Sequence, residues 1–326
     1  MATYLVTGAG GFIGSALVRA LLERGHTVRG LDNFATGNRE NLAEVRSRID
    51  LRQADLLDPA ALSEACRGAD YVLHQAAIPS VPKSIADPVT SHRVNANGTL
   101  ALLVAARDAK VKRVVYASSS SIYGDSPTLP KHEGMPPNPI SPYAVAKLTG
   151  ELYAISFYRV YGLETVSLRY FNIFGPRQDA NSEYSAALAK FITLMLGGEQ
   201  PTIFGDGTQS RDFTFVADVV EANLLAAGAA PQDCGRTYNV ARGDRTTLID
   251  LALAVTEAVG GGPPPRHVEP RPGDVAHSQA DSSRARKAFG FVADVSLPEG
   301  LTLTAPYFRS LYSTERTRRT VRGHLA

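Results

Sequence analysis

The sequence predicts an α/β fold, with a doubly wound parallel sheet and a smaller, discontinuous domain toward the C-terminus. Three features of the 326-residue chain predict this fold. Short apolar runs alternate with helical patterns up to residue 172, and a glycine-rich turn follows the first run. After residue 172 the alternation breaks, and proline becomes frequent in GGGPPPRHVEPRPGD at residues 260–274.

The first half of the chain reads as βαβ units. β-branched runs bounded by turn residues indicate strands, and longer apolar periodic runs indicate helices. The expected strands cover residues 3–8, 26–33, 49–56, 70–77, 112–119 and 164–172. The expected helices between them cover residues 15–25, 60–68, 95–110 and 141–162. Because βαβ crossovers are right-handed, these units predict a doubly wound sheet with helices on both faces.

The second half is less regular. We expect a helix near 185–197, a short strand in PTIFGDG at 201–207, and a return to the first domain through a helix at 217–228 and a strand at 236–241. Since small ligands usually bind in clefts between domains, we expect a cleft there. The predicted units are a first domain (1–172 plus 212–241), a second domain (173–211 plus 242–310) and a basic, frayed tail (311–326).

The composition argues against several classes of protein. A net charge of +2 gives no general reason to expect nucleic acid or a membrane surface as a partner. The two cysteines, Cys66 and Cys234, lack metal-ligand spacing, so we expect buried thiols in a reducing compartment and no metal. Neither a signal peptide nor a bilayer-length apolar run is visible, so the expected location is cytoplasmic.

The glycine-rich turn predicts a dinucleotide site. Gly8, Gly11 and Gly14 stand between an expected strand and an expected helix. Such glycines permit a tight turn, close approach to a pyrophosphate and close helix packing, while the helix N-terminus attracts the phosphates. Asp32 follows at the end of the second strand, where a carboxylate can bond both ribose hydroxyls and would repel a 2′-phosphate. We therefore expect NAD rather than NADP. The alternative is a structural turn and a surface carboxylate.

A second set of residues is suited to proton transfer. SSSSIYGD (118–125) follows an expected strand end, where ligands of open α/β sheets bind, and SPYAVAK (141–147) places Tyr143 and Lys147 one helical turn apart. The pKa of a tyrosine is about 10, so its phenol is little ionised at neutral pH. The ammonium of Lys147 and a positive nicotinamide would lower that pKa, and Ser119 could relay a substrate proton. Packing alone is the alternative interpretation of the Tyr–Lys pair.

These features together resemble a known superfamily over nearly the whole chain. The stretches that carry the resemblance are DLLDPAAL, HQAAIPSVPKSIADP, SSSSIYGD, SPYAVAK, LRYFNIFGPRQD, GDGTQSRDFTFVADVV and RPGDVAHSQAD. With the spaced glycines they resemble the extended short-chain dehydrogenase/reductases. Within these, the chain is most similar to NAD-dependent nucleotide-sugar epimerases, especially UDP-hexose 4-epimerases of the UDP-N-acetylglucosamine type.

The resemblance implies a mechanism and a set of site residues. Tyr143 would take the proton of the sugar 4-hydroxyl while the C4 hydride passes to NAD, Ser119 would share that hydrogen bond, and Lys147 would bond the nicotinamide ribose. The 4-keto sugar would then turn over and take the hydride back on its other face. The remaining cofactor residues implied are Phe12, Ile13, Asn33, Asp55, Leu56, Ala76, Ala77, Asn95 and Tyr170. The substrate residues implied are Ser119, Ser120, Ser121, Tyr143, Asn172, Arg177, Thr202, Phe204, Arg211, Arg271, Asp274 and Ser278.

Two of these positions bear on which sugar is used. Ser278 stands where glucose-restricted members of the family carry a bulky tyrosine, so a small residue leaves room for a 2-acetamido group. Arg177 could instead meet a C6 carboxylate, as in uronate epimerases of similar sequence. The physiological UDP-sugar therefore stays open between hexose, N-acetylhexosamine and uronate.

Three other functions are alternatives to epimerisation. A 4,6-dehydratase or decarboxylase is disfavoured, because a dehydratase needs an Asp–Glu pair where this chain has Ser119, Ser120 and Ser121. A non-catalytic NAD-binding protein is disfavoured by the presence of Ser119, Tyr143 and Lys147. Reduction of a 4-keto sugar with free NAD(P)H is a third option: Asp32 argues against NADPH, and whether the cofactor stays bound is left open. The resemblance also suggests a homodimer formed through a four-helix bundle that includes residues 141–162.

Overall fold

Seven parallel strands form the main sheet of the molecule. The computed structural model describes residues 1–179, 187–270 and 276–323, with side chains up to residue 313. The strand order is β11-β6-β5-β4-β1-β2-β3. These strands are β1 (Thr3–Thr7), β2 (Thr27–Asp32), β3 (Asp50–Gln53), β4 (Tyr71–His74), β5 (Arg113–Ser119), β6 (Glu164–Tyr170) and β11 (Arg236–Val240). The predicted doubly wound sheet is confirmed. Its order reverses between β1 and β4, which is the kind of switch point where ligands bind.

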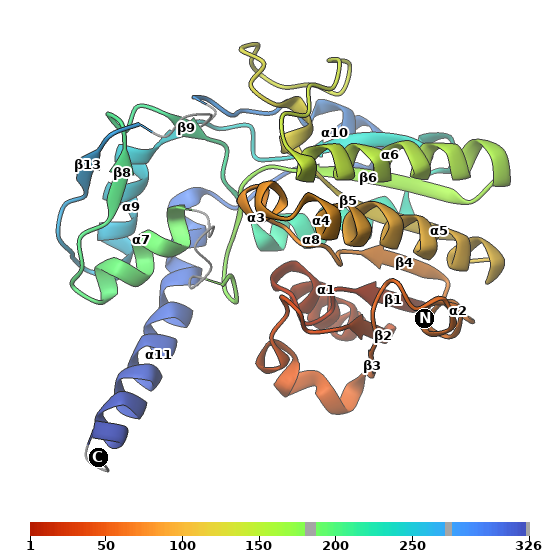
Figure 1. Cartoon of the computed structure of the whole chain (residues 1–326), viewed down its shortest axis with the longest axis horizontal. Helices are drawn as coiled ribbons and strands as arrows, with labels where there is room; N and C mark the ends of the chain where they lie inside the picture. The colour runs from red at the N-terminus through yellow and green to blue at the C-terminus, as the bar shows by residue number, and fades with distance from the viewer. Residues whose placement is uncertain (180–186, 271–275, 324–326) are drawn as a thin grey trace.

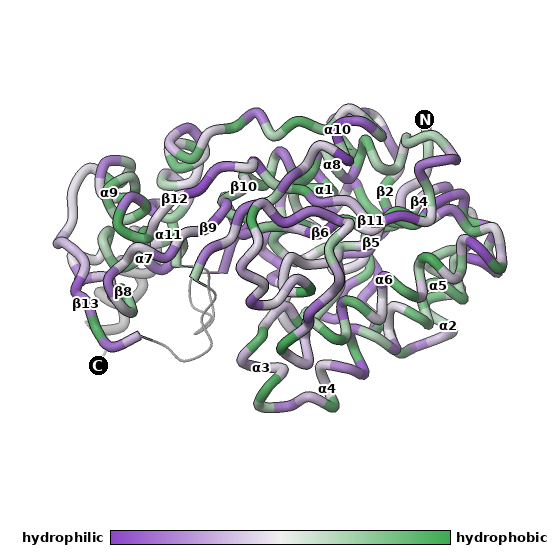
Figure 2. The backbone as a smooth tube through the Cα atoms, turned by 90° about the horizontal axis from the view of Figure 1, so that it is seen from above, coloured by the Kyte–Doolittle hydropathy of each residue, from purple (hydrophilic) through white to green (hydrophobic). Residues whose placement is uncertain are grey.

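Helices cover both faces of the sheet, as Figure 2 shows from above. One face carries α1 (Phe12–Glu23), α8 (Val216–Gly228) and α10 (Ser283–Phe289), and the other carries α2 (Pro59–Cys66), α5 (Gly98–Asp108) and α6 (Pro142–Tyr161). Successive side chains of a strand point to opposite faces. Tyr4 and Val6 accordingly belong to the core under α1 and α8, whereas Leu5 belongs to the core under α2 and α5.

Several short elements connect these units. They are the 3₁₀ segments η1 (Arg39–Arg48), η3 (Ser120–Tyr123) and η4 (Pro231–Asp233), the helices α3 (Val81–Ala86) and α4 (Pro88–His92), and the π-helical turn η2 (Arg93–Asn97) that leads into α5. The expected helix at 95–110 therefore begins as a π turn and is α-helical only from Gly98.

A second group of elements lies apart from the large sheet, at one side of the molecule in Figure 1. The helices α7 (Ala187–Leu196), α9 (Leu248–Val259) and α11 (Leu297–Gly323) share an apolar core. Beside them β8 (Thr202–Phe204) pairs with β13 (Arg266–Val268), and β9 (Ser210–Arg211) pairs with β12 (Thr246–Thr247). The strands β7 (Ile173–Phe174) and β10 (Thr214–Phe215) pair between the two groups.

Two outcomes concern the C-terminal half. The strand expected at 236–241 is β11, which lies beside β6 at the edge of the large sheet. The frayed tail expected from residue 311 is wrong, because α11 continues to Gly323. The boundaries between the two domains stay a prediction. Within the described residues, no helix has the length and apolarity needed to cross a bilayer.

Candidate active site

A cavity opens at the carboxyl ends of the central strands, and it gathers most of the predicted cofactor residues. Of those residues, fourteen line it: Gly8, Gly11, Phe12, Ile13, Gly14, Asp32, Asn33, Asp55, Leu56, Ala76, Ala77, Tyr143, Lys147 and Tyr170. They come from turns after β1, β2, β3, β4 and β6 and from the start of α6. Segments that lie far apart in the sequence therefore meet at the switch point of the sheet.

The glycine turn at the start of α1 leaves space for a phosphate group. A Cβ on Gly14 would overlap the Gly8 carbonyl oxygen, and a Cβ on Gly8, whose φ is +67°, would lie 2.7 Å from the Ala76 nitrogen. The helix begins at an N-cap glycine, Gly11, whose position has no capping side chain, and its first turn holds no acidic residue. The helix start therefore faces the cavity with its positive dipole end unopposed, which fits a pyrophosphate.

Asp32 closes the same part of the cavity. Its carboxylate accepts hydrogen bonds from the backbone of Gly10 (2.8 Å) and Phe34 (2.7 Å), and the residue is 6 % exposed. Burial raises the pKa of Asp32, while the two backbone hydrogen bonds and the charge of Arg39 lower it. Each carboxylate oxygen can accept a second hydrogen bond. The fixed carboxylate can therefore receive ribose hydroxyls, as an NAD site requires.

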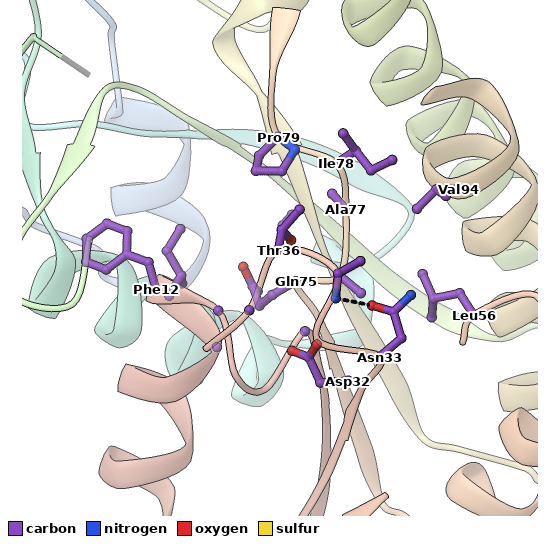
Figure 3. A pocket seen from close by; sticks show the side chains of 18 of the residues that line it. Phe12, Asp32, Asn33, Thr36, Leu56, Gln75, Ala77, Ile78, Pro79 and Val94 are labelled. Carbon is purple, nitrogen blue, oxygen red and sulfur yellow. Dashed lines mark hydrogen bonds between the residues drawn. The ribbon is translucent and has the colours of Figure 1, made fainter. Parts of the chain in front are cut away.

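The far end of the cavity is suited to a flat base. Asn33 donates to Asp55 at 2.7 Å, and the backbone of Leu57 donates to the other Asp55 oxygen at 2.9 Å. Figure 3 shows the apolar side chains of Leu56, Ile78 and Val94 on the side of the cavity away from Phe12. Apolar walls with a few oriented polar groups are typical of sites that bind a nucleotide base.

Asn95 differs from the other predicted cofactor residues, because it does not line the cavity. It is buried, accepts a hydrogen bond from the Ile78 backbone at 2.8 Å and donates to the Ile78 carbonyl at 3.2 Å. The structure thus gives Asn95 a supporting position: it holds the turn after β4 that forms one wall of the cavity.

His74 supports the turn after β4 through the hydroxyl of Thr7. Its ring nitrogens lie 2.7 Å from the Thr7 hydroxyl and 3.0 Å from the Thr99 hydroxyl, and Thr7 in turn accepts from the Ala76 backbone at 3.3 Å. Burial, with a smaller contribution from the charge of Lys147, lowers the pKa of His74 to about 3. The imidazole is therefore neutral at pH 7 and acts as a fixed hydrogen-bonding spacer.

The three predicted catalytic side chains converge at the end of β5. The side chains of Tyr143 and Ser119 lie near each other, since the Ser119 hydroxyl acts to lower the pKa of Tyr143. Lys147, 4 % exposed, donates to the Ala117 carbonyl at 2.8 Å, and its nitrogen lies 5.9 Å from the Tyr143 ring centroid. The start of α6 is fixed by its N-cap, where the Ser141 hydroxyl accepts from the Ala144 backbone at 3.2 Å. This capping sets the position of Tyr143 in the first turn of the helix.

In the protein chain by itself, burial sets the pKa values of Tyr143 and Lys147, and the lowering of the Tyr143 pKa by Lys147 and bound NAD stays a prediction. Burial raises the pKa of Tyr143 to about 12, and the nearby Ser119 hydroxyl opposes this shift only in part. Burial lowers the pKa of Lys147 to about 8, and the nearby carboxylate of Glu151 opposes it. The cause of both shifts is desolvation, which disfavours the charged form of each group.

The predicted substrate residues fall into two groups. Ser120 and Ser121 begin η3 directly after Ser119, and the Ser121 hydroxyl donates to the Ser119 oxygen at 2.9 Å. In the second group, Asn172 donates to the Asp212 carbonyl at 3.1 Å, while Arg211 and the backbone of Ser278 donate to the Ser210 carbonyl at 3.0 and 2.9 Å. Thr202 and Phe204 lie on β8, and Gln209 donates to the Phe204 carbonyl at 2.6 Å.

Three predicted substrate residues have a different outcome. Arg177 has a φ of +70°, and its guanidinium lies 3.4 Å from Glu44 of η1. It therefore contacts the segment after β2. Arg271 and Asp274 lie outside the described residues.

Sequence reasoning missed several residues of the cavity. Gln75 lines it and bonds Tyr170 at 3.2 Å and the buried Asn223 at 3.0 Å. Ser118 also lines it and donates to Glu151. The other missed lining residues are Leu31, Ala35, Thr36, Gly37, Ala54, Ile78, Pro79, Val94 and Ala117. The position of Gln75 directly after the β4 strand was the available signal for that residue.

Comparison with known proteins agrees with the cavity described above. Residues 4–241 match the model of the NAD dependent epimerase/dehydratase family. The chain is 41 % identical to a UDP-glucose 4-epimerase of Mycolicibacterium smegmatis, over 94 % of this chain and 98 % of that protein. It is 39 % identical to the structure of a UDP-N-acetylglucosamine 4-epimerase from Methanobrevibacter ruminantium M1 in complex with UDP-N-acetylmuramic acid, with a TM-score of 0.91 over 95 % of this chain and 99 % of that one.

Other matches widen the range of activities among its relatives. The structure of a UDP-glucuronic acid 4-epimerase from Bacillus cereus with UDP-glucuronic acid and NAD is 32 % identical, with a TM-score of 0.88 over 95 % of this chain and all of that one. A dTDP-glucose 4,6-dehydratase of Streptomyces niveus is 33 % identical over 94 % of this chain and 92 % of that protein. The fold, the cavity and these matches agree: the chain belongs to the NAD-dependent epimerase/dehydratase family.

Proposed function

We propose that this protein is a UDP-hexose 4-epimerase, which inverts C4 of UDP-N-acetylglucosamine and UDP-N-acetylgalactosamine or of UDP-glucose and UDP-galactose. The observation that carries the proposal is that Tyr143 and Lys147 lie together in the wall of the NAD cavity, with the Ser119 hydroxyl beside Tyr143. Bound NAD supplies a reversible hydride acceptor. The chain itself has to orient the sugar and move one proton at the 4-oxygen.

Each of the three side chains has a separate task in this proposal. Tyr143 accepts the proton of the sugar 4-hydroxyl and later returns it, and Ser119 holds the same oxygen through its hydroxyl. Lys147 stabilises the phenolate of Tyr143, because a buried ammonium favours a neighbouring anion.

The residues after β5 favour inversion over loss of water. Ser119, Ser120 and Ser121 occupy the strand end and the start of η3, and they offer hydroxyls to the sugar. A dehydratase needs a carboxylic acid and a carboxylate there to remove water from C5 and C6. The first carboxylate after the strand is Asp125, and it accepts a hydrogen bond from Asn138 at 2.9 Å. The site therefore has the groups for proton relay without those for elimination.

Two positions favour an uncharged sugar. Ser278 is a small residue, so a 2-acetamido group meets no bulky side chain there. Arg177 forms an ion pair with Glu44 at 3.4 Å. This pair partly neutralises the guanidinium that would otherwise be available to bind the carboxylate of a uronate. UDP-glucuronate is the second candidate substrate, since the pair with Glu44 is solvent-exposed on the carboxylate side and such pairs are weak.

A product assay tests the proposal. The purified protein is given UDP-N-acetylglucosamine, UDP-glucose and UDP-glucuronate separately, without added cofactor, and the anomeric protons are followed by NMR. We expect the 4-epimer of UDP-N-acetylglucosamine to form, with slower or no conversion of the uronate. A 6-deoxy-4-keto product, or a pentose, would overturn the proposal in favour of dehydration or decarboxylation.

A further inference from the structure

Glu151 is a buried carboxylate that the proposed reaction does not use directly. It stands one helical turn after Lys147 on α6 and is 2 % exposed. One carboxylate oxygen accepts from the Ser118 hydroxyl at 2.5 Å and from Arg169 Nε at 2.8 Å, and the other accepts from Arg169 Nη2 at 2.7 Å. A bidentate pair with a third donor fixes both the place and the charge of the carboxylate.

The partner of Glu151 is buried as well. Arg169 on β6 is 5 % exposed, and its guanidinium lies 4.7 Å from the Tyr123 ring centroid. Its Nη1 atom has no hydrogen-bond partner among the described residues. Loss of the Glu151 carboxylate would therefore leave an uncompensated cation inside the protein.

The groups around Lys147 give the carboxylate a specific effect. Those that face the amine are His74 on β4, Tyr116 on β5 at 5.2 Å from its ring centroid, and Tyr143 and Glu151 on α6. In the chain without NAD, burial favours the neutral forms of His74, Tyr116 and Tyr143, since it lowers the pKa of the imidazole and raises those of both phenols. Among these described groups, Glu151 carries the negative charge.

We propose that Glu151 is a positioning residue whose carboxylate, fixed by Arg169 and Ser118, keeps Lys147 charged beside Tyr143. The inference rests on the proposed function, in which the ammonium of Lys147 supports the phenolate. Desolvation favours the neutral amine and brings the pKa of Lys147 to about 8, close to working pH. Small changes in local charge therefore decide whether the amine is protonated at neutral pH.

The test measures the charge of Lys147 directly. The chain contains seven lysines, so ¹³Cε-lysine labelling gives few NMR signals, and the Lys147→Met variant assigns the relevant one. In the NAD-saturated protein we expect Glu151→Gln to lower the titration midpoint of Lys147 by about one pH unit or more, because an attractive charge has been removed. Glu151→Asp, which keeps the carboxylate, should retain most of the original midpoint.

The controls separate charge from structure. Glu257→Gln, at an exposed position on α9, should leave the Lys147 midpoint unchanged. If Glu151→Gln does not fold, Glu151→Gln combined with Arg169→Met removes the buried cation too, and a lowered midpoint is again expected. An unchanged midpoint in a folded Glu151→Gln protein, or equal shifts in Glu151→Gln and Glu151→Asp, would overturn the proposal.

The titration also separates this inference from the proposed function. It requires no turnover, so a protein that inverts none of the three UDP-sugars can still show the Glu151 effect. Conversely, an active epimerase whose Lys147 midpoint ignores Glu151 would keep the proposed function and lose only this inference.

Discussion

Burial acts in opposite directions on the two groups that flank the reaction centre. It raises the pKa of Tyr143 to about 12 and lowers that of Lys147 to about 8. Both shifts favour the neutral side chain. The phenolate therefore depends on nearby positive charge, and the ammonium depends on Glu151. A spacing of four residues predicts that Tyr143 and Lys147 are neighbours, but it does not predict how deeply the two side chains are buried.

Removal of the Tyr143 hydroxyl tests its role at the residue scale. We expect Tyr143→Phe to lower kcat by about 10²- to 10⁴-fold, the usual contribution of general acid–base catalysis. The bound NAD content should stay the same, because the ring still lines the cavity. Tyr153→Phe is the matched control: Tyr153 lies on the same helix and is 36 % exposed. A kcat within twofold of wild type for Tyr143→Phe would contradict the assigned role.

His74 should make stability depend on pH. Its pKa is about 3 in the folded protein and about 6.5 in an unfolded chain, so the unfolded state binds the extra proton between these values. The free energy of unfolding should therefore fall as pH drops from about 6.5 toward 3. In His74→Leu this slope should be smaller, although the variant is less stable at pH 7.

Urea unfolding at a series of pH values measures this slope. His132→Leu, at an exposed position, serves as the control and should keep the wild-type slope. A His74→Leu protein with the same pH dependence as wild type would show that the buried imidazole does not carry the effect.

At the scale of elements, the strand–turn–helix unit at the N-terminus is the most constrained part of the site. A Cβ at Gly14 would overlap the Gly8 carbonyl oxygen, which belongs to rigid backbone. We expect Gly14→Ala to separate α1 from the turn, with loss of bound NAD and a lower Tm. Gly228→Ala is the control, because a Cβ there meets nothing within 4 Å and its φ is not positive. Full NAD occupancy in Gly14→Ala, measured by absorbance of the released cofactor, would contradict this account.

The helices and strands that could be predicted from the sequence are those with a strong periodicity of apolar residues. The strands of the large sheet and the helices α1, α2, α5, α6 and α8 were predicted from the alternation of short apolar runs with helical patterns. The short helices α3 and α4 were missed because each has a proline in its first turn, which reads as a loop signal. The C-terminal helix α11 was missed because Pro306 and many charged residues hide its periodicity.

In the site, too, residues within contiguous motifs could be predicted, whereas residues that act through distant partners could not. Residues in contiguous motifs, such as Gly8, Asp32 and Tyr143, were predicted because each motif carries its own physical reason. Gln75 and Glu151 were missed because their partners, Asn223 and Arg169, lie on other elements. Such contacts depend on how the fold brings β4, β6, α6 and α8 together. The spacing of residues within one motif carries no information about this arrangement.

At the scale of the whole molecule, α6 presents an apolar outer face. Val145, Leu152 and Val160 are 45 %, 58 % and 66 % exposed, respectively. A contiguous apolar helix face on a folded protein marks an association surface. The homodimer through a bundle that includes α6 stays a prediction, and this face of α6 is the surface that such a dimer would use.

A charge on this face tests the dimer. We expect Leu152→Glu to convert the protein to a monomer, because it would bury two unpaired carboxylates at a symmetric interface. The fold should be retained, since the side chain points to solvent in the single chain. Leu253→Glu, at a 65 % exposed position on α9, should leave the assembly unchanged. Sedimentation velocity measures the outcome, and a wild-type protein that is already monomeric at micromolar concentration would contradict the prediction.

The central claim is that C4 is inverted by removal and return of the same hydrogen. The most direct measurement uses a UDP-sugar with deuterium at C4, offered to the purified protein in ordinary water. The account predicts a 4-epimer that keeps its deuterium at C4, because the hydride is carried by bound NAD, where it does not exchange with water, and then returns to C4. A 4-epimer whose C4 carries a solvent proton would contradict the account, since the hydrogen would then have exchanged with water during inversion.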